Sequence, residues 1–320
     1  MLLINEATSY ELLGNINEAI PWLAQSFRAI TAGPTVGLRS DVDDPERESR
    51  GLLLGSYVGA MDGVCFKVIG NWRGNRAGLI VVFNTATGCP EVLLSAAHVT
   101  DVRTGAASGA ATEQLARRDS RRLAVLGTGR QSATQLQAML AIRPIEIVNV
   151  WNRTQANAVT WIGKMKSNLN ASVPVFRLCD SPEEACKEAD IIVVSTRAEE
   201  PVLHGAWLRP GTHINAVGAS TPDQRELDLS VLQRADVKTV DSRELALNTG
   251  DFLGPIQQGI LRSDEIQELG ELLLGIHPGR TDDNQITLFK SVGHAANDLV
   301  VARWMAEQAR EAGLGITVEL

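Results

Sequence analysis

The stretch Leu123-Ala-Val-Leu-Gly-Thr-Gly-Arg-Gln-Ser132 decides the fold, because it joins a short apolar run to a glycine turn and then to a helix-forming segment. In this Gly-x-Gly-x-x-Ser pattern, Gly127 permits a tight turn and Gly129 lets the backbone approach a pyrophosphate. The small Ser132 lets the following helix lie close to the strand, with its first N–H groups facing the phosphates. The pattern alone is weak, but a strand before it and a helix after it indicate a dinucleotide-binding turn.

The residues after the next apolar run, 145–150, bear on the choice of dinucleotide. In an NAD-specific site, an Asp or Glu usually ends this strand and accepts hydrogen bonds from the ribose 2′-OH. Asn152, Arg153 and Thr154 stand here instead, and all three can donate to a 2′-phosphate, which favours NADP(H) over NAD(H). In the alternative interpretation, Arg153 is a solvated residue at a helix start and Thr154 is the N-cap.

Bulk composition is that of a globular protein with one large or two medium domains. The chain has 320 residues, of which 44% are hydrophobic and 21% charged. Its net charge of −8 argues against a nucleic-acid or anionic-membrane partner. The apolar runs are too short to span a membrane, and the first residues lack the features of a secretory signal. The four cysteines form no metal-binding pattern and are typical of reduced thiols in a cytoplasmic protein.

Strand-like and helical patterns alternate over the middle of the chain. The apolar runs are 123–126, 145–150, 191–194, 213–217 and 236–240. Such alternation predicts a parallel sheet covered on both faces, that is, a doubly wound α/β domain. The flanking segments differ: an amphipathic helix over 14–31, β-structure over 52–94 with turns at 70–74 and 86–90, an alanine-rich helix over 99–115, and a last helix over 294–312.

Several further segments occur together in one known family and in the same order. With them the chain resembles the ornithine cyclodeaminase/mu-crystallin family along nearly its whole length, closest to the mu-crystallin-like ketimine reductases. The segments are Val102–Ala107, Leu126–Gln131, Val150–Thr154, Pro210–Ser220, Pro222–Asp228, Val240–Arg243, Pro278–Asp283 and Thr287–Ser291.

The resemblance implies an architecture and a chemistry. A Rossmann-type nucleotide domain, 119–292, is expected to be inserted in an α+β substrate and dimerisation domain made of 1–118 and 293–320. A homodimer and a nicotinamide cofactor are expected as well. Members of the family include cyclodeaminases, alanine dehydrogenases, ketimine reductases and opine-type dehydrogenases, all of which pass through a 2-imino acid and move a hydride at its α-carbon.

Three basic residues of the first part are the candidates for substrate chemistry. Arg39 and Lys67 interrupt apolar, strand-like runs, so each is exposed, snorkelling or functional. By resemblance, Arg39 binds the substrate carboxylate, Lys67 handles protons beside the substrate, and Arg103 bridges substrate and cofactor. A lysine desolvated near two arginines is expected to have a lowered pKa, suited to proton exchange near neutral pH. The alternative for each is a surface ion pair or a solvated strand edge.

The residue at position 220 distinguishes the cyclodeaminases of the family from the ketimine reductases. In the cyclodeaminases and the archaeal alanine dehydrogenases, an aspartate that binds the substrate amine stands at this position. Serine cannot act as a carboxylate base near neutral pH, so cyclodeamination is disfavoured. The mu-crystallin branch shares the Val-Gly-Ala-Ser run that ends at Ser220 and the Trp-Asn-Arg-Thr segment that ends at Thr154. Both features therefore favour an NADPH-dependent ketimine reductase.

The remaining candidates are expected to contact the cofactor. Two predicted strands end at Ser195-Thr196 and at Val217-Gly218. Ligands of open α/β sheets bind beyond the carboxyl ends of the strands. Asp298, near the start of the last helix, is either a structural carboxylate or a catalytic one. The other predicted cofactor contacts, including the glycine turn and the family matches, are Arg76, Arg103, Thr104, Gly127, Thr128, Gly129, Arg130, Gln131, Ser132, Ser220 and Ser291.

Together these observations predict an NAD(P)H-dependent reductase of a 2-imino acid, with NADP(H) preferred, NAD(H) as the alternative, and no metal. Two other interpretations remain open. One is an ornithine or lysine cyclodeaminase with tightly bound NAD, and the other is a non-catalytic nucleotide-binding protein. The expected partners are a small imino or amino acid and a second copy of the chain. The side chain of the substrate stays open between cyclic, small acyclic and dicarboxylic imines.

Overall fold

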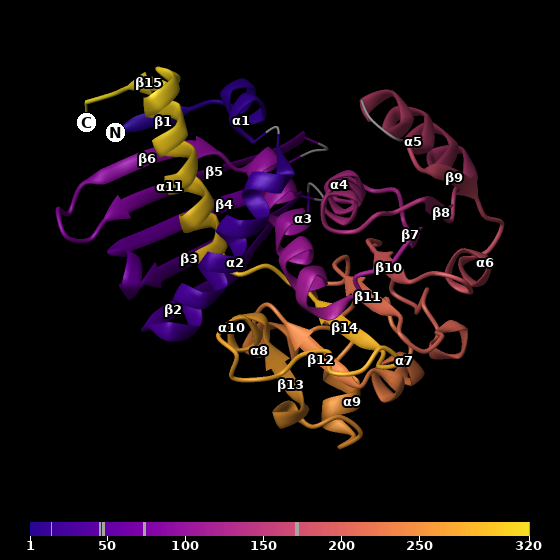
Figure 1. Ribbon diagram of the computed structural model, residues 1–320. Coiled ribbons are helices and arrows are strands. Elements are labelled where there is room, and N and C mark those ends of the chain that lie inside the picture. Colours follow the sequence, from indigo (N-terminus) through magenta and orange to yellow (C-terminus); the bar gives the residue numbers. More distant parts are fainter. Residues whose placement is uncertain (14, 45, 47–48, 73–74, 170–172, 320) are drawn as a thin grey trace. The chain divides into compact units, whose positions relative to one another are not determined.

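The computed structural model describes the chain except for residues 14, 45, 47–48, 73–74, 170–172 and 320 (Figure 1). It divides into two compact units, one made of residues 1–103 and 293–320 and the other of residues 104–292. The division falls inside helix α3 (Ala96–Leu115), whereas the boundary after residue 118 lies beyond this helix and stays a prediction. Among the described residues, no helix is both long and apolar enough to cross a membrane.

A seven-stranded sheet, in the order β15-β1-β6-β5-β4-β3-β2, forms the first unit. Strands β2 to β6 are antiparallel to one another, as short connections between successive strands require, and β1 pairs in parallel with β6. The strands are β1 (Leu2–Ile4), β2 (Thr35–Asp44), β3 (Ser49–Val58), β4 (Gly63–Trp72), β5 (Asn75–Asn84), β6 (Pro90–Ser95) and β15 (Ile316–Thr317).

One face of this sheet is covered by α11 (Ala295–Ala312), drawn in yellow in Figure 1, which contacts β3, β4 and β5 as well as α2 (Ile16–Ala32). The short helix α1 (Glu6–Leu12) and the 3₁₀ turn η2 (Gly59–Met61) complete the unit. Helix α11 starts at His294, whose side chain accepts a hydrogen bond from the Ala296 N–H, and ends at Gly313 in the left-handed region. The sheet face under α11 is therefore the core of the unit.

Two sequence predictions for this unit need correction. Strand β4 runs through Gly70 to Trp72, so the turn predicted for 70–74 starts too early, and residues 73–74 lie outside the described part. Paired β-strand hydrogen bonds with β5 carry the backbone past Gly70, which shows that tertiary pairing overrides a local glycine signal. The helix predicted for 14–31 is α2, which begins at Ile16; residue 14 itself lies outside the described residues.

The second unit is an eight-stranded parallel sheet in the order β13-β12-β14-β11-β10-β7-β8-β9. The strands are β7 (Arg122–Leu126), β8 (Ile147–Trp151), β9 (Val175–Leu178), β10 (Ile191–Val194), β11 (His213–Ala216), β12 (Val237–Val240), β13 (Ile266–Glu268) and β14 (Thr287–Lys290). The helices are α4 (Ser132–Ile142), α5 (Gln155–Asn168), α6 (Pro182–Cys186), α7 (Leu229–Arg234), α8 (Arg243–Ala246), α9 (Leu253–Gln257) and α10 (Leu269–Leu273), with 3₁₀ turns η3 (Gly205–Trp207) and η4 (Ser263–Glu265).

The order of β9, β8, β7, β10 and β11 is that of a dinucleotide-binding sheet, with a topological switch between β7 and β10. The predicted fold class, a doubly wound α/β domain inserted in an α+β domain, is confirmed. The apolar runs do not predict β9, β13 and β14. Strand β9 is an edge strand with exposed Val175 and Leu178, and β14 ends in a charged Lys290, so neither has the uniformly apolar pattern of a central parallel strand.

Candidate active site

Three charged side chains of the first unit, from three different elements, meet in a buried cluster. Lys67 lies on β4, Arg103 on α3 and Asp298 in the first turn of α11. The Lys67 Nζ lies 3.0 Å from Asp298 Oδ1, and the Arg103 Nε donates to the same oxygen at 2.8 Å. The exposed fractions are 1% for Lys67, 5% for Arg103 and 0% for Asp298. The two residues predicted as catalytic therefore lie together, joined by a carboxylate whose role the sequence left open.

The charges of this cluster do not balance. Two cations share one carboxylate, which leaves a surplus of one positive charge in a buried place. Asp298 uses only Oδ1 for both contacts, and its buried Oδ2 has no hydrogen-bond partner among the residues that the structure describes. Because buried charge is costly unless it is compensated, the cluster is suited to an anionic ligand such as a carboxylate.

Lys67 has the lowered pKa that the sequence predicts. Burial and the Arg103 guanidinium lower its pKa, Asp298 raises it, and together they bring it from the usual 10.5 to about 8. The thiol of Cys65, on the same strand, has a raised pKa because it is buried and faces Asp298. At neutral pH, Lys67 is therefore a protonated amine that can release its proton, next to a thiol that stays neutral.

Arg39 lies on the same sheet face as Lys67. It pairs with Leu54 across β2 and β3, and Leu54 pairs with Lys67 across β3 and β4, so the three side chains form one cross-strand row. Arg39 is half-buried. Arg76 lies on β5, and its Nη1 is 3.6 Å from Asp101 Oδ1, so this arginine is paired with a carboxylate.

The glycine turn of the second unit has the shape that a pyrophosphate requires. Gly127 has a φ of 90°, and a Cβ there would lie 2.6 Å from the carbonyl oxygen of Ser195, so only glycine fits. A Cβ on Gly129 would meet only the same oxygen, at 3.7 Å, which leaves room above the backbone. Helix α4 begins at Ser132, and Gln131 before it makes no side-chain capping bond in the described structure. The turn thus fits a bound phosphate.

The residues after β8 lie next to this turn. Asn152 Nδ2 donates to the hydroxyl of Thr128, and Asn152 Oδ1 accepts from the N–H of Thr154 at 3.0 Å. Thr154 occupies the N-cap position of α5, although its side chain makes no capping bond among the described residues. Arg153 and Arg130 are both exposed. Arg153 on this loop and Arg130 in the glycine turn thus supply two exposed cationic side chains.

The other predicted cofactor residues lie at the carboxyl ends of the strands. The backbone N–H groups of Thr196 and Gly218 donate to Glu226, the N–H of Ser220 donates to Gln224, and the hydroxyl of Ser291 donates to Asp241. Thr104 is buried at the start of this unit and accepts a hydrogen bond from Gln135 of α4. Ser195 and Val217 directly follow β10 and β11. These side chains and loops line the strand ends, and their contact with a cofactor stays a prediction.

Sequence reasoning missed Glu226 as a functional candidate. It is fully buried and accepts hydrogen bonds from residues at the ends of β10 and β11. Glu226 lies inside a segment shared with the resembling family, 222–228, but nothing in the residue pattern says which backbone groups a carboxylate will meet.

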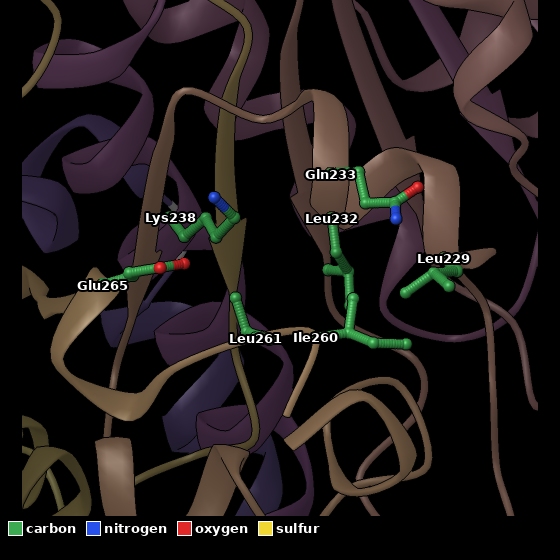
Figure 2. Close-up of a pocket in the computed structure, with 7 residues that line it drawn as sticks. All are labelled: Leu229, Leu232, Gln233, Lys238, Ile260, Leu261 and Glu265. Atoms are coloured by element: carbon green, nitrogen blue, oxygen red, sulfur yellow. The ribbon is translucent and has the colours of Figure 1, made fainter. Parts of the chain in front are cut away.

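A depression elsewhere in the second unit is not a candidate for the cofactor. Figure 2 shows Leu229, Leu232, Lys238, Ile260 and Glu265 among its lining residues. Its volume is about 200 Å³, below that of a typical ligand site. The Lys238 ammonium already donates to the carbonyl oxygen of Ala235 at 2.7 Å. None of the predicted site residues lines it.

The sequence model of the ornithine cyclodeaminase/mu-crystallin family matches residues 3–313 of the chain. The chain belongs to this family. It is 34% identical to the Delta(1)-pyrroline-2-carboxylate reductase of Bacillus cereus, over 99% of this chain and 100% of that protein. It is also 34% identical to the ketimine reductase mu-crystallin of Mus musculus, over 89% of this chain and 90% of that protein.

Solved structures show the same fold. The Delta(1)-pyrroline-2-carboxylate reductase of Thermococcus litoralis, in complex with NADH and L-proline, matches with a TM-score of 0.92 at 34% identity, over 99% of this chain and 100% of that one. An archaeal alanine dehydrogenase dimer with bound NAD matches with a TM-score of 0.90 at 26% identity, over 100% and 99% of the two chains. The predicted family and the predicted class, an oxidoreductase that acts on C=N bonds with a nicotinamide cofactor, are confirmed.

Proposed function

We propose that this protein reduces a cyclic 2-imino carboxylate to the corresponding amino acid, with Δ1-pyrroline-2-carboxylate as substrate and proline as product. The observation that carries the proposal is the buried contact of Lys67 and Arg103 with one oxygen of Asp298, which leaves a positive surplus and a proton donor together. The named reductases of B. cereus and T. litoralis support the choice of a five-membered ring.

Each residue of the first unit has a distinct task in this proposal. Arg103 and Arg39 bind the substrate carboxylate, for which a planar guanidinium is well shaped. Lys67 donates a proton to the imine nitrogen or keeps it protonated, because an iminium carbon accepts hydride far more readily than a neutral imine carbon. Asp298 holds Lys67 and Arg103 in place. The nicotinamide cofactor supplies the hydride, and the second unit binds it.

An activity panel tests this proposal. The oxidation of NADPH and NADH is followed by the loss of reduced-nicotinamide absorbance with cyclic 2-carboxy ketimines, and with 2-oxo acids mixed with ammonia or methylamine. We expect oxidation with the cyclic ketimines, fastest with the five-membered ring. Release of ammonia from ornithine or lysine, without oxidation of NAD(P)H by any imine, would instead identify a cyclodeaminase. Ser220, in place of an aspartate, argues against that result.

For the cofactor, we propose a preference for NADP(H). No carboxylate stands among the residues 152–154 that follow β8, and exposed Arg153 and Arg130 can both donate to a 2′-phosphate. Replacing Arg153 with alanine is expected to weaken NADPH binding by about 10-fold to 100-fold, the loss of one charge-assisted hydrogen bond, and to leave NADH binding unchanged. Titration calorimetry with both cofactors measures this.

The control for this experiment is Arg121→Ala. Arg121 is also exposed, but it precedes β7 at the opposite end of the strand and pairs with Glu146. Equal affinities for NADPH in the Arg153→Ala variant and the unchanged protein would refute the proposed role of Arg153.

We also propose that two copies of the chain associate through the sheet face of the first unit that α11 does not contact. Along β2, β4 and β5 the outward side chains are apolar and exposed by 42% to 64%: Val36, Leu38, Val42, Phe66, Val68 and Leu79. An exposed apolar face of this kind marks an interaction surface. The dimer of the archaeal alanine dehydrogenase supports a second copy as the partner.

Replacing Leu38 with aspartate tests the dimer. We expect light scattering to give the mass of two chains for the unchanged protein and of one chain for this variant, because a charge in a buried apolar interface is unfavourable. The matched control is Val159→Asp on α5, a similarly exposed valine that is not part of this face, which should leave the mass unchanged. A dimeric Leu38→Asp variant would contradict this assignment of the interface.

A further inference from the structure

Glu226 joins the ends of two neighbouring strands of the parallel sheet. Its Oε1 accepts from the N–H of Thr196 at 2.6 Å and from the Thr196 hydroxyl at 2.8 Å. Its Oε2 accepts from the N–H groups of Gly218 and Ala219, both at 2.8 Å. A Cβ on Gly218 would lie 2.0 Å from the carbonyl oxygen of Thr196, so the two loops are in close contact. One side chain thus fixes the loops after β10 and β11.

A second buried carboxylate and an ammonium adjoin Glu226. Lys290 Nζ lies 2.6 Å from Asp251 Oδ2 and 4.0 Å from Glu226 Oε2. Asp251 Oδ1 accepts from the N–H groups of Glu226 and Leu227, at 2.7 and 2.9 Å. None of the three charged side chains is exposed. With both carboxylates ionised, two negative charges face one positive charge, so the group carries a net charge of −1.

The hydrogen bonds favour the ionised form of Glu226. Three backbone N–H groups point at its two oxygens, and a carboxylate accepts them all, whereas a protonated carboxyl would place its own hydrogen among donors. Burial and the neighbouring Asp251 carboxylate raise the pKa of Glu226, and the Lys290 ammonium and these N–H groups oppose the rise without cancelling it. Because three N–H groups donate to its two oxygens, we assign Glu226 as the carboxylate at neutral pH.

The position of Glu226, Asp251 and Lys290 in the sheet indicates which half of a dinucleotide these residues face. A doubly wound sheet binds one mononucleotide on each side of its topological switch point, which here lies between β7 and β10. The residues proposed to bind the 2′-phosphate follow β8, on one side of the switch. The group at the ends of β10 and β11 lies on the other side, which belongs to the nicotinamide half.

We propose that Glu226, with Asp251 and Lys290, is a positioning group whose net negative charge favours the positively charged oxidised nicotinamide over the neutral reduced ring. The proposal rests on the proposed function of the second unit as the cofactor site. The ring gains positive charge as it gives up hydride, so the same field assists imine reduction. A fixed, desolvated charge acts over several ångströms, so the group need not touch the ring.

The affinities of the two cofactor forms test the proposal without turnover. Titration calorimetry on the full chain gives the Kd of NADP⁺ and of NADPH for the unchanged protein, Glu226→Gln and Asp251→Asn. Each substitution removes one negative charge at nearly constant volume. We expect both variants to lose about 10-fold in NADP⁺ affinity relative to NADPH affinity. Thermal melting of each apoprotein shows whether it is folded.

The ratio of the NADP⁺ and NADPH affinities distinguishes an effect of the removed charge from a loss of loop structure. A loosened loop weakens NADP⁺ and NADPH alike, so an unchanged ratio in both variants would overturn the proposal. Asp190→Asn is the matched control. Asp190 is a buried carboxylate that accepts from the N–H groups of Arg121 and Arg122, before β7, at the amino ends of the strands. The Asp190→Asn variant should keep the unchanged protein's ratio of NADP⁺ to NADPH affinity. Binding of neither form by the unchanged protein would instead refute the proposed function itself.

Discussion

Lys67→Met is expected to lower kcat for imine reduction by about 100-fold to 10,000-fold, the usual contribution of a positioned proton donor. Methionine keeps the length of the side chain but cannot donate a proton. Arg103 still donates to Asp298 in this variant, so the remaining pair is neutral and the buried cluster stays intact. Because the cofactor is assigned to the second unit, its Kd should stay within about 2-fold of the unchanged value, which is close to measurement error.

Lys238→Met is the matched control for this variant. Lys238 is also a partly buried lysine on a strand, and burial lowers its pKa as well, but it lies in the depression of Figure 2. Steady-state kinetics should show unchanged turnover for Lys238→Met. If Lys67→Met retained full turnover too, Lys67 would not be the proton donor.

The second large effect is expected in the Asp298→Asn variant, as a shift of the pH dependence of kcat. The Asp298 carboxylate stabilises the Lys67 ammonium and raises its pKa, against the lowering by burial and by Arg103. Without this negative charge, the pKa of Lys67 should fall below about 8. Lys67 must be protonated to donate, so activity is present below its pKa and is lost as the pH rises through it.

The profile of kcat against pH measures this shift. The unchanged protein should lose activity above about pH 8, roughly 10-fold for each further pH unit. In Asp298→Asn the same decline should begin at lower pH, so activity at neutral pH falls while activity in mild acid is largely kept. Asp264→Asn, which removes an exposed carboxylate paired with Arg262, should leave the profile unchanged. A variant with reduced activity but an unshifted decline would show that Asp298 has only a structural role.

The sequence predicted Lys67 and Arg103 but not how they are joined. A charge inside the apolar run 64–69 marks Lys67 as unusual on any reading of the strand. Its partner Asp298 is 231 residues away along the chain, and only the packing of α11 on β4 brings the two together. Local pattern contains no information about such a contact, which is why Asp298 stayed open between a structural and a catalytic role.

The nucleotide-binding turn was predictable because its requirements are local. A tight turn with positive φ needs glycine at 127, and the apolar strand and the helix flank it directly. The strands β9 and β14 were not predictable in the same way, since their places in the sheet depend on pairing with distant segments. The same holds for Glu226, whose partners are backbone N–H groups of two loops, and such groups leave no mark in the residue pattern.

Transfer of deuterium tests the central claim most directly. The protein is incubated with Δ1-pyrroline-2-carboxylate and NADPH that carries deuterium at both C4 positions, and the product is analysed by mass spectrometry and NMR. The account predicts proline with one deuterium at the α-carbon, because the hydride passes to the carbon of the C=N bond. Proline without the label, or no proline while the cofactor binds, would contradict the assignment of this chain as a cyclic imino acid reductase.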